Sequence, residues 1–148
     1  MDFTELNRQL SYAVNGINSA YGALAQSFGL SYNSLMLLTV LDEGECTQKE
    51  VCSILQLPKS TVHSILLEYM KKGYMTLASG TNKKEKLIRL TPSGEEYMQK
   101  VMSALHAIEN KAMEKLGDEL SMELVRVNSE YNRFFNEEVT DFVEKAVF

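Results

Sequence analysis

The chain has 148 residues, 45% of them hydrophobic and 24% charged, with two cysteines and a net charge of -5. This length allows one modest hydrophobic core, and we expect a single domain over residues 1–148. No stretch approaches the roughly 18 uncharged apolar residues of a spanning helix, which excludes a membrane span. The first ten residues lack the form of an export signal, so we expect a cytoplasmic protein.

Apolar residues spaced by three and four positions predict two helices at the start of the chain. The first covers residues 6–28, with an apolar seam of Leu10, Val14, Ile17, Tyr21, Leu24 and Phe28. Gly29 ends this helix, because glycine readily adopts the left-handed conformation of a helix C-terminus. Ser31 can cap a second helix that runs to about Glu43.

Residues 47–73 have the pattern of a helix-turn-helix. The sequence TQKE at 47–50 matches a capping box, in which the threonine hydroxyl and the glutamate carboxylate satisfy free backbone amides. It predicts a short helix to about Leu55. Pro58 favours the first turn of a following helix, which we expect to continue to Gly73 as its C-cap.

The second helix of this unit has two different faces. Val62 and Ile65 are spaced to pack against the first helix, where Cys52 is the small residue that allows close approach. The opposite face is polar at the place where a recognition helix meets base edges in the major groove. These candidate DNA-reading residues are Lys59, Ser60, Thr61, His63 and Ser64. Serine, threonine and histidine make single hydrogen bonds, so we expect modest base discrimination.

A β-hairpin with a basic tip follows the helix-turn-helix. Alternating apolar residues in Met75–Ser79 and Lys86–Leu90 predict two strands, joined through residues 80–82. Lysines at the tip can follow DNA phosphates or enter a minor groove that A·T-rich sequence narrows. These candidate residues are Lys83, Lys84 and Lys86.

Two long helices complete the chain. Thr91-Pro92 begins one helix, and Gly117 interrupts it. The last helix has an apolar stripe of Leu120, Leu124, Val127, Tyr131, Phe135, Val139, Phe142 and Ala146. Such stripes need a partner surface, which a second copy of the chain can supply.

Charge is distributed unevenly along the chain. Residues 1–57 carry a net charge of -4, residues 58–89 carry +5 and residues 90–148 carry -6. Positive charge on one surface attracts phosphate regardless of base sequence. The basic segment coincides with the predicted second helix and hairpin, which favours a contact with nucleic acid over a merely solvated lysine-rich loop.

The order of these elements resembles the MarR family of bacterial transcription regulators over nearly the whole chain. The best-matching stretches are TQKEVCSILQLPKSTVHSILLEYMKKGYM and KLIRLTPSGEEY. The resemblance implies a mainly α fold with a small β-wing. In it, residues 31–91 form a winged helix-turn-helix lobe, and residues 1–30 and 92–148 form dimerisation helices.

The resemblance also implies a function. It indicates a homodimeric, ligand-responsive repressor whose two recognition helices bind a pseudo-palindromic site in double-stranded DNA. Family members commonly have Asp-x-Arg in the wing, where this chain has Asn82-Lys83-Lys84, and an arginine where Ser64 stands. Lysine is more strongly hydrated than arginine, so we expect phosphate contacts and groove shape to contribute more than bidentate base contacts.

Many relatives bind an effector in a crevice between the dimer helices and the DNA-binding lobe. By resemblance, such a crevice would be lined here by Tyr12, Asn18, Tyr32, Met36, Met102 and His106. The alternative role for aromatic and methionine side chains on helices is ordinary core packing.

Other interpretations concern cysteines, histidines and protein partners. Cys46 precedes a helix N-terminus, whose partial positive charge can lower a thiol pKa, so a redox-sensing role is one hypothesis. His63 and His106 lie on separate elements without metal-ligand spacing, and no catalytic motif is present, so we expect no metal, cofactor or enzymatic activity. A winged helix can also serve as a protein-interaction module without a DNA target.

Overall fold

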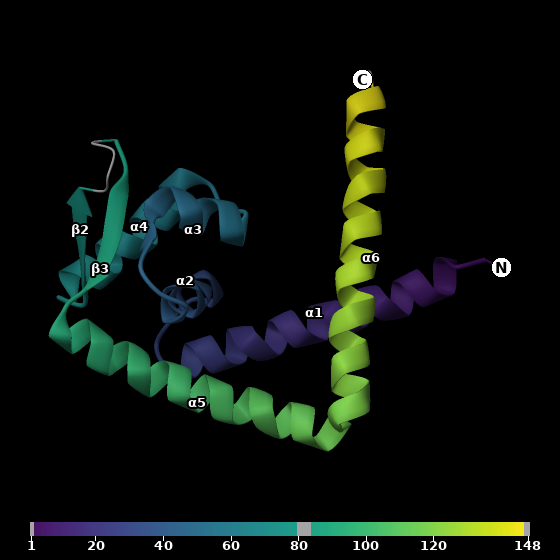
Figure 1. Ribbon diagram of the computed structural model, residues 1–148, viewed down its shortest axis with the longest axis horizontal. Coiled ribbons are helices and arrows are strands. Elements are labelled where there is room, and N and C mark those ends of the chain that lie inside the picture. The colour runs from purple at the N-terminus through teal and green to yellow at the C-terminus, as the bar shows by residue number, and fades with distance from the viewer. Residues whose placement is uncertain (1, 80–83, 147–148) are drawn as a thin grey trace. The chain divides into compact units, whose positions relative to one another are not determined.

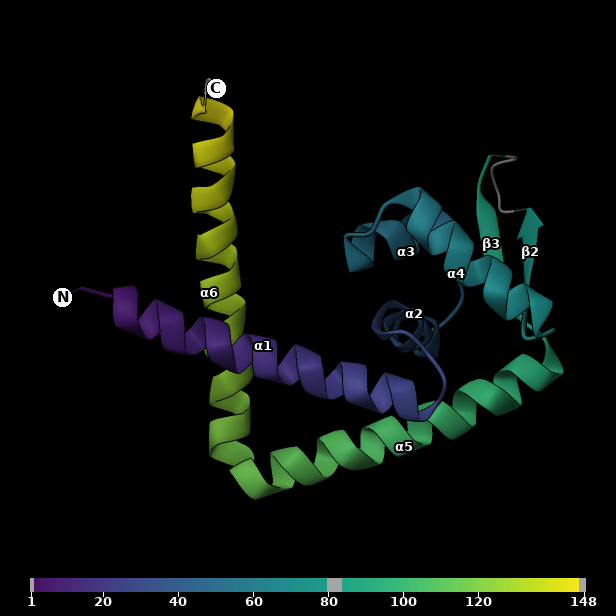
Figure 2. The same cartoon turned by 180° about the vertical axis from the view of Figure 1, so that it is seen from behind.

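The computed structural model describes residues 2–79 and 84–146 and is mainly helical (Figures 1 and 2). The helices are α1 (Thr4–Ser27), α2 (Tyr32–Asp42), α3 (Gln48–Leu55), α4 (Lys59–Lys71), α5 (Pro92–Leu116) and α6 (Asp118–Lys145). The strands are β1 (Cys46–Thr47), β2 (Met75–Ser79) and β3 (Lys86–Leu90). The predicted fold class, mainly α with a small β-wing, is confirmed.

The chain divides into two compact units, residues 1–105 and 106–148, and the hydrophobic core lies in the first. Its largest fully buried side chains are Tyr69, Leu35, Leu37, Leu38, Leu66, Ile88, Leu105, Val51, Val62 and Val101. The buried Tyr69 hydroxyl donates a hydrogen bond to the Ser34 carbonyl at 2.9 Å, which satisfies the polar end of the largest of these side chains.

The helix-turn-helix forms, but Pro58 is the N-cap of α4 rather than a first-turn residue, and Lys72 rather than Gly73 is its C-cap. The capping box is present: the Thr47 amide donates to the Glu50 carboxylate at 2.6 Å, and the Glu50 amide donates to the Thr47 hydroxyl at 3.2 Å. Gln56 at the end of α3 adopts a left-handed conformation with φ 53, which turns the chain toward Pro58 and α4. In Figures 1 and 2 the strands β2 and β3 stand beside α4.

The sheet contains one strand that the sequence pattern did not predict. β1 pairs antiparallel with β3, Cys46 opposite Ile88 and Thr47 opposite Leu87, so that the sheet order is β1-β3-β2. Two residues are too few to produce a visible alternation of apolar and polar side chains. Thr47 is at the same time the N-cap of α3, and the capping motif was the stronger signal.

The antiparallel strands β2 and β3, with the segment between them, form the wing. Its base lies at the junction where α4 ends and α5 begins. Gly73 has φ +74, and its carbonyl accepts hydrogen bonds from the Thr91 hydroxyl at 2.6 Å and the Ser93 hydroxyl at 3.1 Å. The Thr91 hydroxyl also accepts from the Gly94 amide at 3.1 Å, as a capping residue does. A Cβ at position 94 would overlap the Tyr74 carbonyl. The LTPSG stretch therefore joins the two ends of the hairpin to the helices on either side.

The second unit comprises the end of α5 and the whole of α6. None of the described residues of α6 is buried. Its exposed large hydrophobic side chains are Leu120, Met122, Leu124, Val125, Val127, Tyr131, Phe134, Phe135, Val139, Phe142 and Val143. Ion pairs within the helix, such as Arg133 with Glu137 at 2.9 Å, are exposed and contribute little stability.

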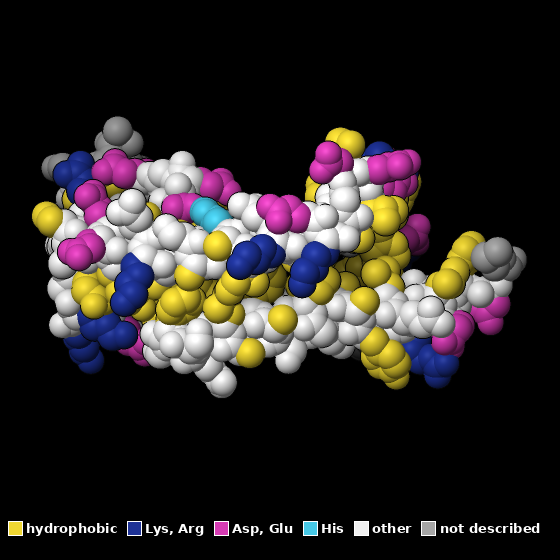
Figure 3. All heavy atoms as spheres, turned by 90° about the horizontal axis from the view of Figure 1, so that it is seen from below, with side chains coloured by type: hydrophobic (Ala, Val, Ile, Leu, Met, Phe, Trp, Pro, Cys, Tyr) yellow, Lys and Arg dark blue, Asp and Glu magenta, His cyan; other side chains and the backbone are white. Residues whose placement is uncertain are grey.

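Exposed apolar side chains also occur in the first unit. On and before α1 they are Phe3, Leu6, Tyr12, Val14 and Ile17. Hydrophobic side chains are plainly visible at the surface in Figure 3. No described helix alone is long and apolar enough to span a membrane; α1 and α2 reach that composition only as a pair, and they are bent by 90°.

We expect Gly94→Ala to destabilise the protein by about 2 kcal/mol or more, because the new methyl group must displace the Tyr74 carbonyl from the junction. Urea unfolding followed by circular dichroism measures the change. Gly16→Ala is the matched control: nothing lies within 4 Å of its added Cβ, and alanine is favoured inside a helix by about 0.5–1 kcal/mol. Equal stability of the Gly94→Ala variant and the wild type would refute this role.

Candidate nucleic-acid interface

The first turns of α4 separate a polar, exposed face from a buried apolar face. Lys59, Ser60, His63 and Ser64 are exposed, and Thr61 is half-buried. Val62, Ile65, Leu66 and Tyr69 of the same helix are buried. The predicted division of this helix into two faces is confirmed, and the predicted DNA-reading side chains remain available to solvent.

One of these side chains already has a partner within the helix. The Ser64 hydroxyl donates a hydrogen bond to the Ser60 carbonyl one turn earlier, at 3.0 Å. A serine bonded in this way offers mainly its oxygen lone pairs to a ligand. Ser64 can therefore accept from a base amino group, but its proton is already used.

The wing places further basic side chains on the same unit. Lys84 and Lys86 are exposed, whereas Lys83 lies outside the described residues. Arg89 of β3 is also exposed, and its nitrogen lies 3.8 Å from a Glu45 carboxylate oxygen. At this distance and exposure the ion pair is weak, so Arg89 keeps most of its charge available to phosphate.

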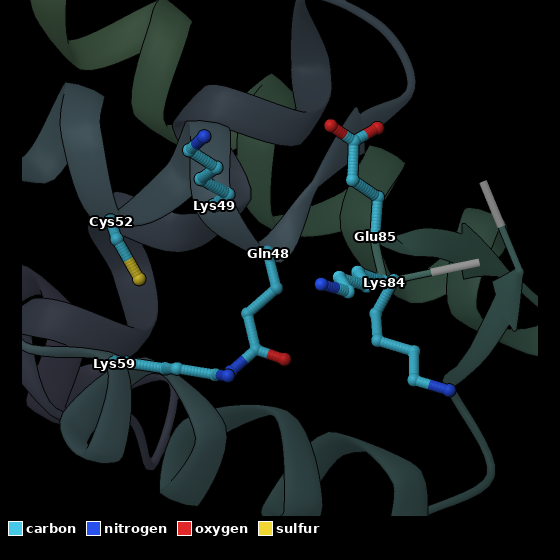
Figure 4. A pocket seen from close by; sticks show the side chains of 7 residues that line it. Gln48, Lys49, Cys52, Lys59, Lys84 and Glu85 are labelled. Atoms are coloured by element: carbon cyan, nitrogen blue, oxygen red, sulfur yellow. The ribbon is translucent and has the colours of Figure 1, made fainter. Parts of the chain in front are cut away.

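Residues of α3, α4 and the wing line one pocket of about 420 Å³. α3 contributes Gln48, Lys49 and Cys52, and α4 contributes Lys59. The wing contributes Lys84, Glu85 and Lys86. In Figure 4 Gln48 lies in the middle, with Lys59 and Cys52 on one side and Lys84 and Glu85 on the other. Three predicted DNA-contacting lysines, Lys59, Lys84 and Lys86, thus line one pocket.

Gln48 and Lys49 are residues of this surface that the sequence analysis did not select. Both belong to the TQKE motif, which was interpreted only as a capping box. Gln48 is 6% exposed, and its side-chain Nε2 is buried without a hydrogen-bond partner. No signal in the sequence distinguishes this glutamine from an ordinary first-turn residue, because its burial is a property of the folded chain.

Burial of Cys46 opposes the lowered thiol pKa that its position before a helix suggested. Cys46 is 8% exposed within β1, and burial raises the pKa of its thiol to about 11, with a further increase from the nearby Glu50 carboxylate. The lowered pKa that the helix N-terminus was expected to produce is outweighed, because a thiolate loses hydration inside the protein. A redox-sensing role for Cys46 stays a hypothesis, without the support of a lowered pKa.

The predicted effector-site residues have different environments. Met102 is 3% exposed and belongs to the core, and Met36 packs partly buried against it. Tyr12 and Tyr32 are 68% and 38% exposed, and Asn18 is also exposed. His106 is exposed and belongs to the second unit. Core packing accounts for the two methionines, and the effector crevice stays a prediction.

We expect Cys46 in a Cys52→Ser variant to react with iodoacetamide at about pH 8 roughly a hundredfold more slowly than in the same variant unfolded in urea. The thiolate is scarce well below a pKa of about 11, whereas an unfolded cysteine has a pKa of about 8.5. Mass spectrometry of quenched samples measures the rate. In the reciprocal control, Cys46→Ser, the half-buried Cys52 should react faster than Cys46. Similar folded and unfolded rates for Cys46 would contradict its burial.

The geometry of α3, α4 and the β2–β3 hairpin defines a winged helix-turn-helix. No family model and no curated protein matches the sequence. Solved structures do match the fold. A MarR-family regulator from Neisseria meningitidis has a TM-score of 0.81 and 22% identity, over 95% of this chain and 99% of that chain.

Two further solved structures are similar to this chain over most of its length. The transcriptional regulator BldR from Sulfolobus solfataricus has a TM-score of 0.71 and 15% identity, over 90% of this chain and 99% of that chain. MepR of S. aureus, solved as a complex with DNA, has a TM-score of 0.69 and 17% identity, over 91% of this chain and 98% of that chain. The chain therefore has the winged-helix fold of MarR-family transcription regulators, and the resemblance stated from the sequence is confirmed at the level of the fold.

Proposed function

We propose that the protein is a cytoplasmic, sequence-specific transcription regulator that binds double-stranded DNA. The observation that carries this proposal is the common basic surface of α4 and the wing, where Lys59, Lys84 and Lys86 line one pocket in a chain of net charge -5. Such local concentration of charge favours a polyanion. The structural neighbours support the proposal, since they are named as transcription regulators and one of them is a DNA complex.

The readout that we propose relies on backbone contacts more than on bases. The exposed side chains on the first turns of α4 are a lysine, two serines and a histidine, and one serine hydroxyl is engaged within the helix. Phosphate contacts position a protein on DNA, while bidentate base contacts discriminate sequence. We therefore infer that spacing of two recognition helices and groove shape supply much of the specificity.

We propose that the protein acts as a homodimer. The described part of α6 has no buried residue although it carries many large apolar side chains, and α1 exposes several more. Extended apolar surface of this kind is characteristic of an interface. Two copies would place two recognition helices on one pseudo-palindromic site. Repression, and release by a small ligand, follow from the resemblance to the MarR family.

We expect Lys84→Glu and Lys86→Glu each to weaken DNA binding by about tenfold or more, because each variant replaces an attraction to phosphate with a repulsion. Fluorescence anisotropy with a duplex selected by the wild type from random DNA measures affinity. The slope of log affinity against log salt should fall by about one per lost phosphate contact. Lys100→Glu, the same charge change at an exposed position of α5, should bind as the wild type does.

Two results would oppose the proposed function. If the wild type selects no duplex, the alternative of a protein-interaction module is favoured. If Lys84→Glu and Lys86→Glu bind as tightly as Lys100→Glu, DNA is bound through another surface.

We expect Phe135→Asp to convert the protein to a monomer, because Phe135 is 55% exposed on the apolar stripe of α6 and a charge there would be buried in the dimer. Sedimentation equilibrium measures the mass. Thr140→Asp is the matched control, since it places the same charge on an exposed polar position of the same helix. A dimer that survives Phe135→Asp, or a wild type that is monomeric at micromolar concentration, would refute the arrangement.

A further inference from the structure

Gln48 presents an unusual polar group in the pocket between α3, α4 and the wing. Its side chain is 6% exposed, and Nε2 is buried without an acceptor. A buried N–H group without a partner costs about 1–3 kcal/mol, so proteins rarely keep one unless it has a use. The chemistry of the other lining residues indicates which kind of acceptor suits the Gln48 amide.

The pocket is rich in donors and positive charge. Lys49, Lys59, Lys84 and Lys86 all line it, and each ammonium group can donate hydrogen bonds but cannot accept them. The opposing charge among the lining residues is the Glu85 carboxylate, on a half-buried residue. Four cations and an amide donor against one carboxylate leave a strong excess of positive potential at the site.

We propose that Gln48 and the lysines around it bind one phosphate group in this pocket. A phosphate supplies several acceptor oxygens and negative charge, which match the excess of donors and of positive charge among the lining residues. The volume of about 420 Å³ lies within the range of small-ligand sites and accommodates a phosphate with an attached sugar. The same chemistry has two sources, a free phosphate compound or a phosphate of the DNA backbone.

The location of the pocket gives the proposal a consequence for DNA binding. Lys59, Lys84 and Lys86 belong both to the pocket and to the proposed DNA surface, so a free phosphate compound bound here competes with DNA. If the phosphate belongs to the DNA, Gln48 is a contact that fixes α3 and the wing on the same backbone position. This second source rests on the proposed function, whereas the first does not.

The side-chain amide of Gln48 provides a direct test in the full-length, ¹⁵N-labelled protein. Its NMR signals are assigned by their loss in Gln48→Met, which keeps the length of the side chain and removes the donor. We expect inorganic phosphate to shift these signals, and chloride at the same ionic strength to leave them in place. Duplex DNA, added separately, reports on the other source.

The variant separates binding from folding. We expect Gln48→Met to weaken phosphate binding by about tenfold, followed on the backbone amides of the pocket, because a hydrogen bond to a charged group is lost. Its melting temperature should equal or exceed that of the wild type, since an unsatisfied donor has been removed. Gln99→Met, at an exposed glutamine of α5, should change neither quantity.

The outcomes distinguish the sources and can overturn the proposal. A shift with phosphate alone assigns the pocket to a free phosphate compound, and a shift with duplex alone assigns it to the DNA backbone. No shift with either, or an equal shift with chloride, overturns the proposal. Because the phosphate experiment contains no DNA, it decides the pocket even if the protein proves to bind no duplex.

Discussion

The contact between the Tyr74 carbonyl and Gly94 sets the position of the wing. With no side chain at Gly94, the start of α5 lies directly against the strand that leaves α4. The Thr91 and Ser93 hydroxyls then bind the Gly73 carbonyl and tie the end of β3 to the end of α4. The stacked rings of Tyr74 and Tyr97, with centroids 4.5 Å apart, extend this contact along α5. Both strands of the hairpin are thereby fixed at their base, next to the helix that carries the candidate DNA-reading residues.

Fixing the wing creates the pocket at its side. Lys84 and Lys86 are distant in sequence from Gln48 and Lys59. β3 pairs with β1, which leads directly into α3, and β3 also contacts α3, so the four residues line one pocket. The small strand β1 thus connects the two ends of the basic surface. It also buries Cys46, which explains why the pKa of a thiol next to a helix N-terminus is raised rather than lowered here.

Much of the fold could be predicted because its signals are local. The capping box at Thr47 and Glu50, the glycine after α4 and the alternating residues of β2 and β3 each report the conformation of their own segment. The burial of Val62 and Ile65 beside an exposed Lys59 follows from helical spacing alone.

Features that depend on distant partners could not be predicted in this way. The pKa of Cys46 is raised by burial of its thiol in β1, which pairs with the distant strand β3, and the burial of Gln48 arises only in the folded chain, where it lines a pocket with residues of α4 and the wing. In both cases the local motif suggested a different environment from the one that the tertiary structure provides. The extent of the domain, the dimer and the effector crevice stay predictions, because each concerns an arrangement beyond a single compact unit.

The exposed state of α6 bears on how the cell controls the amount of this protein. A helix with no buried residue gains little stability from packing within its own chain, and its exposed ion pairs add little; such helices are marginal in water. Under the proposed dimer its order depends on a second copy, so its stability rises with protein concentration by mass action. Newly made chains at low concentration would then be the most open to proteolysis, and the level of the protein would be governed by degradation as well as by synthesis.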